Sequence, residues 1–97
     1  MIMSDPTLLL LSSLADGDKH GYAMMEDIER FAGVRLGPGT LYGAITRLEE
    51  RGWIAPVAAE DRRQPYTITR AGREALREQL GDMGRIVSAG RRRLGVA

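Results

Sequence analysis

The sequence predicts a mainly α-helical protein with one small antiparallel hairpin. Apolar residues recur at helical spacing over most of residues 5–51, residues 53–69 have the composition of two short strands, and a heptad-like apolar seam follows to residue 94. The 97 residues suit one domain, or one small domain with an oligomerising arm. Because a domain this small has a thin core, a second subunit would add burial.

The first predicted helix begins at Asp5 and ends before Asp16. Aspartate is a favoured N-cap, and the proline that follows it is favoured at the first helical position. The four leucines at 8–11 cover more than one helical face, so we expect burial on two sides, one of them by something other than the domain itself. On this argument we predict that Leu8 and Leu11 contact a second subunit.

The second and third predicted helices flank a glycine-containing turn at 33–37. The second begins near His20 and ends at Gly33, because glycine can adopt the left-handed conformation that ends a helix. The third begins at Pro38 and ends before Gly52. The stripe that the second helix is expected to bury consists of Tyr22, Met25, Ile28 and Ala32. The stripe expected for the third consists of Leu41, Ala44, Ile45 and Leu48.

A hairpin and a long last helix complete the chain. Residues 53–57 and 66–69 have strand composition, the polar loop 58–65 joins them, and Thr69 can cap the helix that follows. The last helix has apolar residues at alternating intervals of four and three, but Gly81, Gly84 and Gly90 each weaken it by about 1 kcal/mol. It therefore needs a partner surface. The dimerisation contacts predicted on this helix are Leu76, Leu80, Met83, Val87 and Leu94.

Three helices followed by a two-stranded wing describe a winged helix-turn-helix. The turn at 33–37 separates the second and third helices as that motif requires. We therefore predict a winged helix-turn-helix domain over residues 5–69 and a C-terminal dimerisation helix over residues 70–95.

Charge is unevenly distributed along the chain. Residues 1–34 carry six acidic and two basic side chains, whereas residues 35–97 carry seven acidic and twelve basic ones. Such asymmetry is typical of proteins whose basic part binds a polyanion, although short segments also fluctuate by this much. No apolar run is long enough to cross a bilayer and the N-terminus lacks a secretion signal, so we expect a cytoplasmic protein without a membrane partner.

The sequence does not predict an enzyme. Cysteine is absent, which excludes disulfides and thiolate metal sites. The chain has a single histidine and neither a nucleophile-elbow nor a phosphate-loop motif. We therefore predict no catalytic residue, no metal and no cofactor.

The third predicted helix carries the strongest functional signal. The side opposite its inward stripe has almost no side-chain bulk in its first half. This side consists of Gly39, Gly43, Thr46 and Glu50. It is flanked on one side by Thr40, Arg47 and Arg51 and on the other by Tyr42. So bare a side would let the helix backbone approach the major groove of DNA closely. A marginal helix whose glycines are tolerated by tertiary packing is the alternative.

The sequence resembles the PadR family of bacterial transcription regulators. The motifs that carry the resemblance are His20-Gly21-Tyr22, Gly39-Thr40-Leu41-Tyr42, Arg47-Leu48-Glu49, Arg62-Arg63 and Ala71-Gly72-Arg73. Together with the residues around them they cover roughly residues 5–80. The chain departs from the family at Gly43, where a proline is usual, and at Gln64-Pro65, where the wing is less basic than in many members.

The resemblance implies a homodimeric repressor of transcription that binds double-stranded DNA sequence-specifically. The recognition helices of a two-fold dimer would lie about 34 Å apart, one turn of duplex, so the expected target is an inverted repeat. The predicted DNA contacts are Lys19, Gly39, Thr40, Tyr42, Gly43, Thr46, Arg47, Arg62 and Arg63. A small-molecule effector of unknown identity is left open. Because no aromatic residue follows Tyr66, we do not expect the aromatic-drug pocket that some relatives form with their last helix.

Several of these assignments have alternatives. Tyr42 could pack on Tyr22 instead of contacting DNA. The arginines of the wing could lie in a solvated loop, balanced by Glu60 and Asp61. The lone histidine, His20, is expected to cap a helix or face solvent. For the chain as a whole, the alternative is a winged-helix protein–protein interaction module that does not bind DNA.

Overall fold

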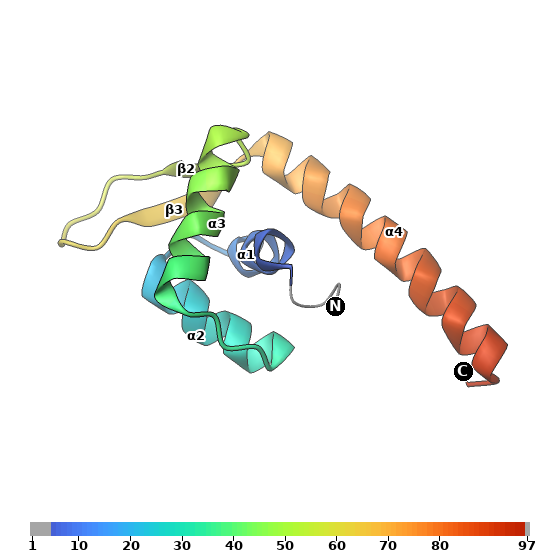
Figure 1. The fold of residues 1–97 in the computed structure, drawn as a ribbon. Helices are drawn as coiled ribbons and strands as arrows, with labels where there is room; N and C mark the ends of the chain where they lie inside the picture. Colours follow the sequence, from blue (N-terminus) through green and yellow to red (C-terminus); the bar gives the residue numbers. More distant parts are fainter. Residues whose placement is uncertain (1–4, 97) are drawn as a thin grey trace.

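The computed structural model describes residues 5–96. Its elements in chain order are α1 (Pro6–Leu14), β1 (Lys19–His20), α2 (Gly21–Ala32), α3 (Pro38–Glu50), β2 (Ile54–Pro56), β3 (Pro65–Ile68) and α4 (Arg70–Leu94). The first three helices form a head, the wing loop between β2 and β3 projects from one side of it, and α4 leaves as a long arm (Figure 1). The predicted mainly α winged helix-turn-helix with a long last helix is confirmed.

Side chains cap three of the helices that the structure describes. Asp5 Oδ1 accepts hydrogen bonds from the N–H and the hydroxyl of Thr7, at 3.0 and 2.8 Å. Thr69 Oγ1 accepts the N–H of Gly72 at 3.1 Å, and His20 Nδ1 accepts a backbone N–H in the first turn of α2 at 3.2 Å. These bonds satisfy N–H groups that a helix start leaves without an intrahelical partner. The predicted caps are confirmed.

Helix α1 is surrounded by other elements of its own chain. Leu10, Leu11 and Leu14 are fully buried, and Leu8 keeps 7% of its surface. Because α1 contacts α2, α3, α4 and β3, the leucine run is buried on all its faces within one chain. The prediction that a second subunit covers one face of α1 was therefore wrong, because α4 of the same chain lies there. Leu8 and Leu11 are core residues, and Leu11 has no exposed surface to offer a second subunit.

The buried face of α2 differs from the predicted stripe. Met24 and Ile28 are fully buried, whereas Tyr22 is 56% exposed and Met25 is half-buried. Two adjacent methionines allow either face of an amphipathic helix to turn inward. The close packing of α2 on α3 at Gly21 selects the face that carries Met24.

The wing belongs to a three-stranded antiparallel sheet with the order β1-β3-β2. Ala55 pairs with Thr67 in the predicted hairpin. On the other edge of β3, Lys19 pairs with Tyr66. This third strand was not predicted, because two residues are too few to show an alternating pattern. It ties the start of α2 to the base of the wing.

Helix α4 leaves the head where two backbones come into close contact. A Cβ added at Gly72 would lie 2.1 Å from the carbonyl oxygen of Trp53. One turn of helix later, Leu76 is buried in the core, and Arg73 Nη1 donates to the carbonyl oxygen of Ala15 at 3.3 Å. Beyond these contacts α4 extends away from the head (Figure 1). No helix among residues 5–96, α4 included, is long and apolar enough to cross a membrane.

Candidate nucleic-acid interface

The outward side of α3 is open and nearly without side chains at its start. The predicted inward stripe is confirmed, since Leu41, Ala44, Ile45 and Leu48 are buried. On the opposite side, a Cβ added at Gly39 would meet nothing within 4 Å. One added at Gly43 would meet only Arg47 Nη1, at 3.6 Å. Tertiary packing therefore does not require glycine at either position.

Hydroxyl groups border this bare side. Thr40 and Thr46 are exposed, and Thr46 Oγ1 donates to the carbonyl oxygen of Tyr42 at 3.0 Å. Tyr42 is 51% exposed. Its hydroxyl end lies over Gly21, where an added Cβ would be 2.7 Å from the phenolic oxygen. Tyr42 thus holds α3 against the start of α2 while half of its surface faces solvent.

The wing presents two exposed arginines, Arg62 and Arg63. Among residues 5–96 neither forms an ion pair with Glu60 or Asp61; Asp61 Oδ1 instead accepts the backbone N–H of Arg63 at 2.9 Å. Gln64 Nε2 donates to two backbone carbonyls of the wing, each at 2.8 Å. Both guanidinium groups therefore stay exposed without a direct ion pair to the two carboxylates of the same loop.

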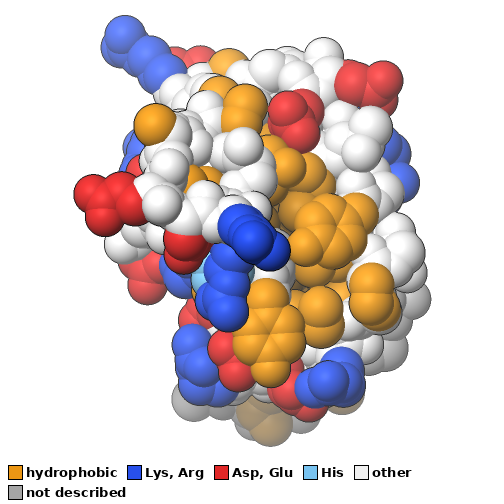
Figure 2. All heavy atoms as spheres, turned by 90° about the vertical axis from the view of Figure 1, so that its left-hand side faces the viewer, with side chains coloured by type: hydrophobic (Ala, Val, Ile, Leu, Met, Phe, Trp, Pro, Cys, Tyr) orange, Lys and Arg blue, Asp and Glu red, His pale blue; other side chains and the backbone are white. Residues whose placement is uncertain are grey.

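A pocket of about 530 Å³ lies between the start of α2, α3 and the wing. Its lining residues are His20, Gly21, Tyr22, Tyr42, Arg62, Arg63, Gln64 and Tyr66. Burial raises the pKa of Tyr66, and the nearby Glu49 and Tyr42 raise it further. The Tyr66 phenol is therefore protonated and able to donate. Seen from the wing side, hydrophobic side chains form a patch with basic side chains next to it (Figure 2).

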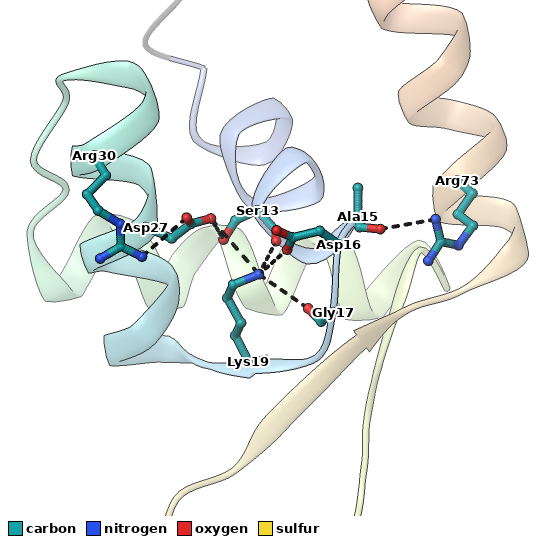
Figure 3. Close-up of polar contacts among 8 residues, drawn as sticks. All are labelled: Ser13, Ala15, Asp16, Gly17, Lys19, Asp27, Arg30 and Arg73. Atoms are coloured by element: carbon teal, nitrogen blue, oxygen red, sulfur yellow. Dashed lines mark hydrogen bonds and ion pairs between the residues drawn. The ribbon is translucent and has the colours of Figure 1, made fainter.

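Lys19 does not point toward solvent as a phosphate contact would. Its ammonium group donates to Asp16 Oδ1 at 2.6 Å and to the carbonyl oxygens of Ser13 and Gly17, and it lies 4.0 Å from Asp27 Oδ2 (Figure 3). The side chain is only 18% exposed. The bond to Lys19 and its charge lower the pKa of Asp16. Lys19 therefore caps the end of α1 and joins it to α2.

The predicted dimerisation residues fall into two groups. Leu76 is buried within its own chain and Met83 packs partly against the core. Leu80, Val87 and Leu94 are 50%, 51% and 81% exposed and continue along the arm of α4. Ile86 is also exposed, at 60%, although it lies outside the heptad positions from which the contacts were predicted.

Several residues at the pocket were not predicted as site residues. His20 was expected to cap a helix or face solvent, and Gln64 and Tyr66 were assigned to the wing without a site role. Arg63 lies 43 positions from His20 in the chain, and no local pattern connects them. The described part of the chain contains no group of three or more acidic, histidine or cysteine side chains that could hold a metal ion.

The comparisons with known proteins agree with this architecture. The transcriptional regulator PadR-like family matches residues 10–78. Transcriptional regulator Rv3488 of Mycobacterium tuberculosis is 36% identical over 89 residues, which cover 86% of this chain and 82% of that protein. A 37.1 kDa protein in transposon TN4556 of Streptomyces fradiae is 44% identical over 86 residues, which cover 89% of this chain but 25% of that protein. The chain thus spans a quarter of the length of the transposon protein.

Solved structures share the fold. A transcriptional regulator from Clostridium thermocellum has a TM-score of 0.80 at 26% identity, with 94% of this chain and 91% of that chain covered. Bacillus subtilis PadR in complex with operator DNA has a TM-score of 0.68 at 20% identity, with 80% and 48% covered. The family match spans most of the winged helix and the start of α4. The chain belongs to the PadR-like family of transcriptional regulators.

Proposed function

We propose that this regulator binds double-stranded DNA sequence-specifically, as a homodimer that represses transcription from an inverted repeat. The open, glycine-lined side of α3 carries the proposal, because that side is exposed and Tyr42 at its edge lines the same pocket as the wing arginines Arg62 and Arg63. A structural relative, Bacillus subtilis PadR, has been crystallised with operator DNA. By analogy, α3 enters the major groove and the wing lies along the adjacent backbone.

The contacts divide into two roles. Gly39 and Gly43 let the backbone of α3 approach the groove, where Thr40, Thr46 and Arg47 meet base edges or the nearest phosphates. In the same proposal Tyr42, Arg62 and Arg63 contact the DNA backbone. Lys19 is left out of this set, because its ammonium group is bound within the head.

We expect the two roles to separate experimentally. Replacing both wing arginines, Arg62→Ala with Arg63→Ala, should weaken binding similarly for all DNA sequences and reduce the salt dependence, since phosphate contacts are lost. Thr40→Ala should instead change the preferred sequence. Fluorescence anisotropy on specific and scrambled duplexes at several salt concentrations measures both effects. A sequence-dependent effect of the arginines would mean that the roles are reversed.

The exposed apolar face of α4 supports the homodimer. Beyond Met83, which packs partly against the core, and beside it at Leu80, its large apolar side chains are at least half-exposed in the described chain, and Leu80 and Val87 repeat at heptad spacing. Pairing α4 with the α4 of a second copy would bury them. A two-fold axis between the two arms would then present two recognition helices to one face of the duplex, about 34 Å apart.

We expect Leu80→Asp to give monomers, because it would bury a charge in the proposed seam. Leu80 is half-exposed in the single chain, so the substitution should leave the head folded. Sedimentation velocity measures the oligomeric state and circular dichroism checks the fold. Glu78→Asp, a conservative change at an exposed position of α4, is the control and should remain dimeric. A dimeric Leu80→Asp protein would exclude this face as the interface.

The second candidate is a winged-helix protein–protein interaction module, which the large exposed apolar face of α4 would also suit. Salt distinguishes the two functions. Doubling the salt from a low starting value should weaken a DNA complex several-fold, because phosphate contacts release counterions. The test is a gel shift against promoter DNA of the gene for this chain. A failure to bind it, or binding that is indifferent to salt, would favour the protein partner.

A further inference from the structure

We propose that the pocket between α2, α3 and the wing holds one phosphate group of the DNA backbone, bound jointly by His20 and Arg63. This proposal rests on the proposed function and adds to it a specific binding site for one phosphodiester group. The pocket residues lie on three elements that are far apart in the sequence, namely the start of α2, α3 and the wing. Their meeting point is created by the fold.

The pocket is chemically suited to an anion. Two of its lining side chains, Arg62 and Arg63, are cationic, and none is a carboxylate. The phenols of Tyr22, Tyr42 and Tyr66 line it as well. Tyrosine hydroxyls and arginine guanidinium groups are common donors to DNA phosphates. The volume of about 530 Å³ leaves room for the sugar next to the phosphate.

His20 and Arg63 present two hydrogen-bond donors to the pocket. His20 Nδ1 accepts the N–H of Ala23, so the proton of the neutral ring must lie on Nε2. Arg63 Nη1 lies 3.1 Å from that Nε2. Guanidinium nitrogens can only donate, so the two neighbouring nitrogens are both donors, and no acceptor of residues 5–96 bridges them. An oxygen of a bound phosphate would accept from both.

The surroundings hold the two donors in place. The cap bond to α2 orients the His20 ring. The bond from the backbone N–H of Arg63 to Asp61 Oδ1 and the two bonds from Gln64 Nε2 shape the wing on the other side. Tyr42, packed over Gly21, closes the side of the pocket toward α3. A preorganised pair of donors loses little freedom on binding.

The test is a scan of single uncharged methylphosphonate groups along both strands of a duplex selected by the wild-type dimer from genomic DNA. We expect one position in each half-site where removing the phosphate charge weakens wild-type binding roughly tenfold, as for one lost phosphate contact at low salt. With the Arg63→Gln variant, a methylphosphonate at that position should no longer weaken binding, whereas methylphosphonates at the other sensitive positions should weaken it as they do for the wild type. His20→Asn should do the same, because asparagine retains the cap but lacks the Nε2 donor.

Arg30→Gln is the matched control, because Arg30 is a 70% exposed arginine of α2 that pairs with Asp27 outside the pocket. It should reproduce the wild-type scan. If Arg63→Gln and His20→Asn also reproduce the wild-type scan, the pocket is not a phosphate-binding site, although the protein still binds DNA. If the wild type binds no duplex, the proposed function fails first.

Free inorganic phosphate carries the same acceptor oxygens as a phosphate of the DNA backbone and could occupy the same pocket. We expect inorganic phosphate to leave the NMR signals of His20 and Tyr66 unchanged at concentrations where the duplex shifts them. If phosphate alone shifts these signals equally well and the methylphosphonate scan shows no position that depends on Arg63, the pocket binds a free anion. The assignment to the DNA backbone would then be overturned.

Discussion

Replacing Gly43 with leucine should weaken DNA binding strongly while making the folded chain slightly more stable. Gly43 lies in the middle of α3, where glycine costs a helix about 1 kcal/mol relative to alanine. An added Cβ would meet only the end of the flexible Arg47 side chain, at 3.6 Å, so the fold has room for a side chain. The same side chain would stand between the helix backbone and the major groove.

The expected loss of affinity is about 100-fold or more, which corresponds to about 2.8 kcal/mol. Fluorescence anisotropy measures binding, and urea denaturation measures the free energy of unfolding. Gly43→Ala serves as the graded control, since it should give most of the gain in stability with a much smaller loss of affinity. Unchanged binding by Gly43→Leu would show that this side of α3 does not face DNA. A loss of stability would contradict the open space described at Gly43.

Replacing Gly72 with alanine should destabilise the fold, although alanine is the better helix former. The new Cβ would lie 2.1 Å from the carbonyl oxygen of Trp53 and 2.9 Å from Ile68 Cγ1. Atoms of a backbone cannot rotate away, so α4 or the wing must shift. Overpacking of this kind costs about 1–3 kcal/mol, which outweighs a gain in helix propensity of about 1 kcal/mol.

Urea denaturation of Gly72→Ala should therefore give a lower free energy of unfolding than wild type. Gly81→Ala is the matched control in the same helix, because its added Cβ meets only Arg85 Nη1, at 3.9 Å. That variant should be more stable than wild type. Equal stabilisation of both variants would mean that α4 and Trp53 are not in close contact.

Gly72 also affects the proposed operator geometry. It sits where α4 leaves the head, and α4 carries the face that we propose pairs two copies. A change in the direction of α4 would alter the separation of the two recognition helices. We therefore expect Gly72→Ala to favour a half-site spacing different from that of the wild type, which selection of bound fragments would reveal.

The sequence alone determined the four helices, the hairpin and the outward face of α3. Local signals sufficed for this. An N-cap such as Asp5 or Thr69 bonds to a backbone N–H within three residues, and a C-cap glycine such as Gly33 ends a helix through its own left-handed backbone conformation. The helical period of Leu41, Ile45 and Leu48 likewise decided which side of α3 faces outward. These determinants lie within one or two helical turns, so reading the chain in order recovers them.

Only the tertiary structure decided how distant segments meet. It buried Leu11 by its own chain, turned Lys19 inward to Asp16, and added β1 beside β3. It also brought His20 within 3.1 Å of Arg63. These outcomes depend on contacts between residues that are separated in the chain, and the sequence pattern around each residue is the same whether its neighbour is its own core, solvent or another molecule. The direction of a charged or apolar side chain is settled by the partner that the fold brings to it.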